Sequence, residues 1–257
     1  MKSLCRSGLR TVAVVAAVLA IAVASTWLGP LSGIAVAQEP QFTTDFRLED
    51  CEFVARGANP YFILRPGYQL VFEGQEDGQT IRLVITVLRE TKQIFLPDVG
   101  VVTTRVVEER ESVDGELVEV SRNFFAICTK TGDVFYFGER VNIFNPDGTV
   151  SHEGSWRAGV GDAVPGMIMP GTFLLGARYV QEQAPDVAMD RSEHVAMGLE
   201  VNTTAGRFEK CVQVRETTPL EPGAVGVKTY CPGVGLVSDG VLQLVEFGFP
   251  GASGAAK

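Results

Sequence analysis

Residues 101–144 read VVTTRVVEERESVDGELVEVSRNFFAICTKTGDVFYFGERVNIF, and this stretch decides the fold class. It holds three runs rich in Val, Ile, Thr, Phe and Tyr, at residues 101–113, 116–129 and 134–144. β-Branched and aromatic residues favour strands, and Asp114-Gly115 favours a tight hairpin turn because both positions accept positive φ. Asp77-Gly78 and Asp147-Gly148 predict the same kind of turn elsewhere in the chain. We therefore predict consecutive antiparallel strands here. A two-residue turn places Arg110 opposite Glu119, so that opposite charges face each other on a solvated hairpin.

Outward from this stretch, more strands are expected at residues 68–74, 81–90, 149–156, 210–217 and 225–231. The best helical segment, residues 184–195, is short and has a proline at its second position, so little helix is expected. Residues 154–171 hold five Gly and two Pro and are predicted to connect two halves. The predicted fold is all-β and mainly antiparallel, as a curved sheet, a half-barrel or a barrel.

The two halves share a spacing pattern. Pro66-Gly67 recurs as Pro170-Gly171, and Arg110-Glu111 recurs as Arg215-Glu216, at offsets of 104 and 105 residues. This pattern predicts an internal repeat of residues 59–153 and 165–240. A chance recurrence of common residue types is the alternative.

The N-terminal 37 residues have the composition of an export signal. A basic start is followed by an apolar run at residues 11–28, and Ala35-Val36-Ala37 fits the small-x-small pattern of signal-peptidase sites. We predict a signal peptide at 1–37, an irregular segment at 38–58, an antiparallel β domain at 59–249 and a flexible tail at 250–257. An uncleaved N-terminal anchor is the alternative.

Net charge excludes some partners. The chain has 22 basic and 31 acidic residues, and three of the basic residues but none of the acidic ones lie in residues 1–37. An acidic chain without a basic run cannot neutralise phosphates, so nucleic acid is not an expected partner. After the signal, no apolar run is long enough to cross a bilayer, so no stable membrane span is expected once the signal is cleaved.

Four cysteines remain after the signal, and an exported chain favours disulfides between them. Cys211 and Cys231 lie at equal distances from Glu221, in two predicted strands that flank a turn. Opposed residues in an antiparallel pair have the Cα spacing that a disulfide needs. We therefore predict Cys211–Cys231 and, by elimination, Cys51–Cys128. Four buried free thiols are the alternative.

Two sets of residues are candidates for a site. His152, His194, Met167 and Met169 could bind a metal ion such as copper, although core packing is the favoured interpretation of the methionines. Aromatic strand residues form the second set and predict either a sandwiched core or the wall of a ligand cavity. The second set is Phe124, Phe135, Phe137 and Phe144.

Three segments resemble exported bacterial β-rich proteins of unknown function. Residues 59–68, NPYFILRPGY, are similar to their N-P-Y-F-x-L-x-P-G opening, and residues 230–237, YCPGVGLV, to their Y-x-P-G-V-G-L-V strand near the C-terminus. Residues 204–211, TAGRFEKC, resemble their T-P-A-G-x-F-x-x-C segment. The resemblance spans residues 59–249 and implies an antiparallel β fold akin to the curved sheets of periplasmic lipoprotein carriers. It brings no catalytic residues, and Cys231 departs from the alanine usual at that position.

The sequence predicts no cofactor and contains no nucleophile elbow, phosphate-binding loop or dinucleotide fingerprint. We expect a non-enzymatic protein of the periplasm, cell envelope or extracellular space that binds an apolar, lipid-like small molecule or an envelope protein. Two alternatives stay open: a structural or interaction module without a cavity, and an enzyme that depends on carboxylates or on a metal.

Overall fold

The structure is a computed structural model that describes residues 41–250. The predicted signal peptide at 1–37 and most of the predicted tail at 250–257 lie outside the described residues. Among residues 41–250 there is no helix long and apolar enough to span a membrane.

Strands dominate the described chain, as predicted, and the one short 3-10 helix is Leu48–Asp50. The strands before the middle of the chain are β1 (Phe53–Val54), β2 (Gly57–Asn59), β3 (Phe62–Leu64), β4 (Gln69–Glu76), β5 (Gln79–Leu96), β6 (Gly100–Val113), β7 (Glu116–Cys128), β8 (Val134–Phe144) and β9 (Val150–Ser151). The later strands are β10 (Trp156–Arg157), β11 (Val164–Met169), β12 (Arg178–Val180), β13 (Glu182–Gln183), β14 (Arg191–Thr203), β15 (Gly206–Thr217), β16 (Val225–Cys231), β17 (Gly235–Asp239) and β18 (Leu242–Gly248).

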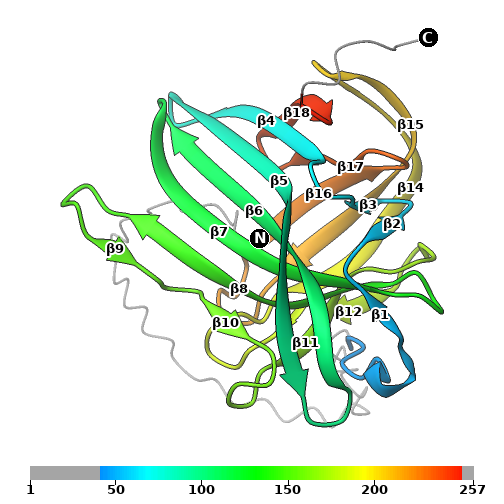
Figure 1. Ribbon diagram of the computed structural model, residues 1–257. Helices are drawn as coiled ribbons and strands as arrows, with labels where there is room; N and C mark the ends of the chain where they lie inside the picture. Colours follow the sequence, from blue (N-terminus) through cyan, green and yellow to red (C-terminus); the bar gives the residue numbers. More distant parts are fainter. Residues whose placement is uncertain (1–40, 251–257) are drawn as a thin grey trace, which may run out of the picture. The chain divides into compact units, whose positions relative to one another are not determined.

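One large antiparallel sheet contains all of these strands except the β2–β3 hairpin (Figure 1). Its order is β12-β14-β15-β16-β17-β18-β4-β5-β6-β7-β8-β11-β13, and β1, β9 and β10 pair with strands along this path. The earlier and later parts of the chain therefore meet twice, where β18 pairs with β4 and where β11 pairs with β8. The sheet curves and is not closed by a continuous ladder. Its end strands β12 and β13 follow each other in the chain, so one short segment pairs with both ends of the sheet.

Two of the three predicted Asp-Gly turns have positive φ at both residues, whereas at Asp147-Gly148 only Gly148 does, with φ of 82°. Asp77 and Gly78 have φ of 51° and 81°, and Asp114 and Gly115 have φ of 51° and 86°. Positive φ at both central residues matches the right-handed twist of the flanking strands. These turns join β4 to β5 and β6 to β7.

One prediction for the middle of the chain was wrong, and the expectation of little helix was confirmed. Residues 154–171 do not form a simple connection, because they contain β10 and β11, which both pair with β8. Residues 184–195, the best but weak helical segment, form no helix and contain an isolated bridge between Ala184 and Ala188 and the start of β14. Tertiary pairing overrides the weak local helix preference in this segment.

Two disulfides hold the ends of strands, and their pairing is the predicted one. Cys211–Cys231 joins opposed residues of β15 and β16, with Cα atoms 4.2 Å apart. Cys51–Cys128 ties the segment before β1 to the end of β7, with Cα atoms 5.2 Å apart. The internal repeat of residues 59–153 and 165–240 stays a prediction.

Candidate functional site

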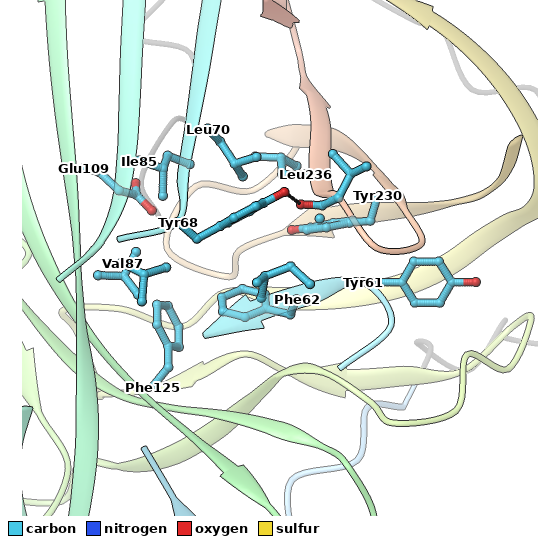
Figure 2. Close-up of a pocket in the computed structure, with 14 residues that line it drawn as sticks. Tyr61, Phe62, Tyr68, Leu70, Ile85, Val87, Glu109, Phe125, Tyr230 and Leu236 are labelled. Carbon is cyan, nitrogen blue, oxygen red and sulfur yellow. Dashed lines mark hydrogen bonds between the residues drawn. The ribbon is translucent and has the colours of Figure 1, made fainter. Parts of the chain in front are cut away.

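A small cavity lies between the β2–β3 hairpin and the inner face of the sheet (Figure 2). Its volume is about 40 Å³. Most of the lining is aliphatic or aromatic, with Glu109 as the charged member. The lining residues are Tyr61, Phe62, Ile63, Tyr68, Leu70, Ile85, Val87, Val107, Glu109, Phe125, Tyr230, Val234, Gly235 and Leu236.

Two segments far apart in the sequence build this cavity. They are residues 59–68 and 230–237, the segments that carry most of the resemblance described above. The Tyr68 hydroxyl donates a hydrogen bond of 2.8 Å to the carbonyl of Val234, and the Gly233 N–H donates one of 2.8 Å to the carbonyl of Pro60. The cavity therefore forms only after the first and last parts of the β domain have met.

Asn59 fixes the β2–β3 hairpin over the sheet. Its buried side-chain amide donates hydrogen bonds of 3.0 Å and 2.7 Å to the carbonyls of Gly132 and Pro170. Its Oδ1 accepts a bond of 2.8 Å from the Tyr61 N–H. The ring of Phe62 then contacts that of Phe125 in an edge arrangement, with centroids 5.0 Å apart. Because the Asn59 side chain bonds three backbone groups, it holds the β2–β3 hairpin, which covers the cavity, in one position.

A surface groove of about 480 Å³ lies beside the cavity. Ile63 and Tyr68 line both spaces, so these two side chains separate the cavity from the groove. The groove is also lined by Ala58, Asn59, Pro60, Arg65, Gly233 and Phe249. Burial raises the pKa of Tyr68 to about 12, so its hydroxyl keeps its proton at neutral pH.

Carboxyl side chains continue the inner face of β6 and β7 beyond Val107. Side chains alternate along a strand, so Glu109 and Glu111 share the face of Val107. Glu111 is paired directly with Glu119 of β7, because the register shifts by one residue between Glu111 and Ser112. The predicted pairing of Arg110 with Glu119 was therefore wrong. The bulge brings like charges together and turns them inward.

Burial raises the pKa of each of these three carboxyl groups. For Glu119 the value is about 7, and the neighbouring carboxylates Glu111, Glu139 and Glu109 add to the effect of burial. For Glu111 the nearby charges are those of Glu109, Asp239 and Glu76. Desolvation and like charges both favour the neutral form, and Glu119 is therefore partly protonated near neutral pH.

A buried ion cluster faces these glutamates from β15, β16 and β17. The Lys228 ammonium lies 2.7 Å from Glu216 Oε2 and 3.7 Å from Asp239 Oδ2, and all three side chains are buried. The Gln181 amide donates a 2.8 Å bond to Glu216 Oε1. Burial by itself lowers the pKa of Lys228, but Asp239 and Glu216 outweigh it and hold the pKa well above its ordinary value. Lys228 is therefore charged and has its counterions.

Tyr230 links the ion cluster to the cavity. It lies on β16 two residues after Lys228, is 2% exposed and lines the cavity with its ring. Its hydroxyl has no hydrogen-bond partner in the described part of the chain. Figure 2 shows this hydroxyl directed toward the centre of the lining side chains, with Glu109 across from it. A buried hydroxyl without a hydrogen-bond partner lowers the stability of the folded protein by about 1–3 kcal/mol. Such groups are rare in folded proteins and often have a functional role.

The aromatic residues predicted to bind a ligand lie elsewhere. Phe135 contacts the rings of Phe46 and Phe53, and Phe137 contacts Phe53, at centroid distances of 5.4–5.7 Å. These contacts form a sandwiched core, which is one of the two predictions made for these aromatic residues. Phe124 is buried and Phe144 is 38% exposed, and neither lines the cavity. Phe125, one residue from Phe124, lines the cavity instead.

The residues of the predicted metal site serve other contacts. His194 has both ring nitrogens engaged, 2.9 Å from the Tyr179 hydroxyl and 2.8 Å from the Leu174 carbonyl. His152 Nδ1 lies 2.9 Å from the Val141 carbonyl. Met169 is fully buried in the core, and Met167 packs against it. Within residues 41–250 no group of three or more His, Cys, Asp or Glu side chains could hold a metal ion.

Sequence reasoning missed the cavity, although a signal was present. Residues 59–68 and 230–237 were singled out for their resemblance, but spacing alone gave no reason to place them together. The predicted Cys211–Cys231 disulfide fixed the register of β15 with β16. It did not show which strands of the first half lie next to the strands that follow β16. Comparisons with protein-family models, with curated proteins and with solved structures found no match.

Proposed function

We propose that this chain is an exported, non-enzymatic binding protein that takes a small, largely apolar ligand into the cavity beneath the β2–β3 hairpin. The observation that carries the proposal is the convergence of residues 59–68 and 230–237 on one apolar space. Ligand sites are commonly apolar spaces with a few placed polar groups. Glu109 and the Tyr230 hydroxyl are such groups here.

Export is supported by the two disulfides, because such bonds persist in oxidising compartments. The signal-like residues 1–37 agree with this assignment. The periplasm, the cell envelope and the extracellular space all satisfy it.

The volume narrows the ligand expected from the sequence. A water molecule needs about 10–15 Å³ of cavity volume, so the cavity of about 40 Å³ has room for only a few water molecules. A lipid acyl chain is too large for this cavity and could enter only if the β2–β3 hairpin moved. The proposal is therefore for a small ligand, or for the end of a larger one whose remainder lies in the neighbouring groove.

Xenon tests the apolar cavity directly, because it enters dry cavities of suitable size. The purified protein would be pressurised with xenon while its methyl NMR signals are recorded. We expect saturable shifts at Leu70, Ile85 and Leu236, which line the cavity, and none at the exposed Leu220. Absence of saturable shifts at the three lining residues would refute the proposal.

A cavity-enlarging variant gives a second readout. Phe125→Ala removes a lining ring, so binding of benzene should become detectable or stronger. Phe95→Ala is the matched control, since Phe95 is 63% exposed and lies outside the lining. Equal benzene binding by both variants would contradict the location of the site.

An interaction module is the second candidate, and one observation favours it. Phe95 and Val101 are paired near the turn of the β5–β6 hairpin, and they are 63% and 62% exposed. Exposed apolar residues at a hairpin end suit contact with an envelope protein. Retention of an envelope protein by the unaltered chain, lost in a Phe95→Ser/Val101→Ser variant that still binds xenon, would support this function.

A further inference from the structure

We infer that the ligand is a small organic cation, an alkylammonium ion with an apolar body, whose ammonium group lies between Glu109 and the Tyr230 hydroxyl. This inference rests on the proposed binding function and names the chemistry of its ligand. Its apolar body would occupy the cavity toward Ile63 and Tyr68.

The charge of the inner face is the first argument. Within residues 41–250, no hydrogen bond or ion pair reaches the carboxyl groups of Glu109, Glu111 or Glu119. Lys228 cannot compensate them fully, because Glu216 and Asp239 already hold it. Arg105 is also engaged, donating bonds of 2.8 Å and 2.7 Å to the carbonyls of Ala55 and Arg89. Lys228 acts on Glu109 only through its charge and makes no ion pair with it, so a cation that enters this space gains the attraction of this carboxyl group.

The Tyr230 hydroxyl is an independent argument, because it does not depend on the number of acidic residues. It is buried, lacks a partner and points into the cavity. A hydroxyl oxygen accepts a hydrogen bond from an ammonium N–H. Glu109, on the opposite wall, supplies a charged acceptor for a second N–H.

The rest of the lining favours an organic cation over a metal ion. Calcium and magnesium require six or more oxygen ligands, and the described carboxyl groups form no cluster that could hold a metal. The rings of Phe62, Tyr68 and Phe125 instead surround the cavity. Aromatic faces attract a desolvated ammonium group by about 2 kcal/mol or more.

The neighbouring groove explains how a cavity of this size could take more than a methylammonium ion. Only Ile63 and Tyr68 are shared by the two spaces. An alkyl chain that passes these side chains would reach the groove beside Pro60 and Phe249. Arg65, which is exposed in the groove, disfavours the reversed orientation with the ammonium group outside.

Three probes of nearly equal size separate charge from apolar contact: butylammonium, 1-butanol and butyrate. Each would be titrated at pH 7.5 and constant ionic strength while the methyl signals of Leu70, Ile85 and Leu236 are followed. We expect butylammonium to bind at least tenfold more tightly than 1-butanol, and butyrate not to shift these signals. Equal or stronger binding of 1-butanol would overturn the inference.

Two conservative substitutions test the proposed contacts of the ammonium group with Glu109 and with the Tyr230 hydroxyl. Glu109→Gln should weaken butylammonium at least tenfold, and Tyr230→Phe should weaken it several-fold, with xenon binding unchanged in both. Glu108→Gln is the matched control, because Glu108 is adjacent in β6, points to the opposite face and pairs with Arg122 at 3.0 Å. It should change butylammonium affinity less than twofold. Equal effects at positions 108 and 109 would overturn the assignment.

The outcomes distinguish the two levels of the proposal. If xenon binds but butylammonium has no advantage over 1-butanol, the inference fails and the binding function stands. If neither xenon nor any butyl probe shifts the lining methyl signals, both fail. If calcium chloride at millimolar concentration displaces butylammonium, the site is one for an inorganic cation and the inference is again overturned.

Discussion

The β6–β7 and β15–β16 hairpins both place a glutamate on the inner face of the sheet, but they compensate its charge differently. In β15–β16 the pairing is regular from Val212–Tyr230 to Thr217–Val225, and Glu216 lies beside Lys228. In β6–β7 a shift after Glu111 places Glu111 directly opposite Glu119. One hairpin therefore carries its own counterion, and the other presents carboxyl groups without one.

This difference separates structural charge from charge that is available to a ligand. A buried ion pair is costly to break but needs nothing from outside. Carboxyl groups without a counterion respond by raised pKa values, as at Glu119, or by binding a cation. The cavity lies between these two hairpins, with Glu109 from β6 and Tyr230 from β16.

The largest expected effect comes from removing the counterion of the β15–β16 hairpin. Lys228→Met leaves Glu216 and Asp239 buried without a cation, which should lower the free energy of unfolding by about 3–5 kcal/mol. Urea denaturation at pH 7.5 measures this loss, and Lys92→Met, at an exposed position of β5, is the control. Adding Glu216→Gln and Asp239→Asn should restore part of the stability. A loss below 1 kcal/mol would show that the ion cluster is not structural.

The second-largest effect on stability is expected from removing the Cys211–Cys231 disulfide of the β15–β16 hairpin. The Cys211→Ala/Cys231→Ala variant opens a disulfide with a sequence separation of 20 residues. A loop of this length restricts the unfolded chain by about 3 kcal/mol, so unfolding should become easier by about that amount. Denaturation of both proteins under non-reducing conditions provides the measurement. An unchanged urea midpoint would contradict the expected role of the bond.

The pH dependence of stability ranks third. Burial raises the folded-state pKa of Asp239 to about 6 and of Glu119 to about 7, both above the values in an unfolded chain. The folded state then binds more protons than the unfolded state, so stability falls as pH rises from about 5 to 8. We expect a loss on the order of 2 kcal/mol across this range. The charged and titratable groups that face these two are Glu109, Glu111, Glu139, Glu216, Lys228 and Tyr230.

Urea midpoints recorded at pH 5, 6, 7 and 8 would check this direction. A midpoint that rises from pH 5 to pH 8 would mean that the inner carboxyl groups are ionised and stabilised in the folded protein. Butylammonium should reduce the loss at pH 8, since it binds the ionised form.

The smallest effect is expected from the β6–β7 hairpin. Glu119→Gln removes a partly buried carboxylate and its like-charge contact with Glu111, so it should stabilise the protein at pH 8 by about 1 kcal/mol. At pH 5, where Glu119 is already protonated, the difference should vanish. Glu116→Gln, an exposed change near the same turn, should have no such pH-dependent effect. A destabilising Glu119→Gln at pH 8 would argue for an undetected favourable contact of that carboxylate.

The sequence was most informative where the determinants are local. Asp77-Gly78 and Asp114-Gly115 identified two turns because positive φ is a property of those residues, and the runs at 101–113, 116–129 and 134–144 match β6, β7 and β8 within one residue. The Cys211–Cys231 pairing followed from symmetry about Glu221. Register failed in β6–β7, because no local pattern signals the shift after Glu111.

The candidate site was harder to predict from the sequence, because its residues are far apart along the chain. Val234 and Tyr68 are 166 residues apart, and their contact depends on the pairing of β18 with β4. The aromatic residues chosen from the central strands were reasonable by composition, but Phe46 and Phe53 cover Phe135 and Phe137. No residue of β8 lines the cavity, because the elements that pack against an apolar strand decide whether it lies in the core or faces a cavity.

By itself, the sequence determined the all-β class, the main strands, two tight turns and the disulfide pairing, because residue preferences and short-range geometry are sufficient for these. Only the tertiary structure decided that β18 pairs with β4, that a one-residue shift opposes Glu111 and Glu119, and that Glu109 and Tyr230 face one cavity. Strand order and bulges depend on contacts between distant segments, and a shift of one residue changes which side chains share a face.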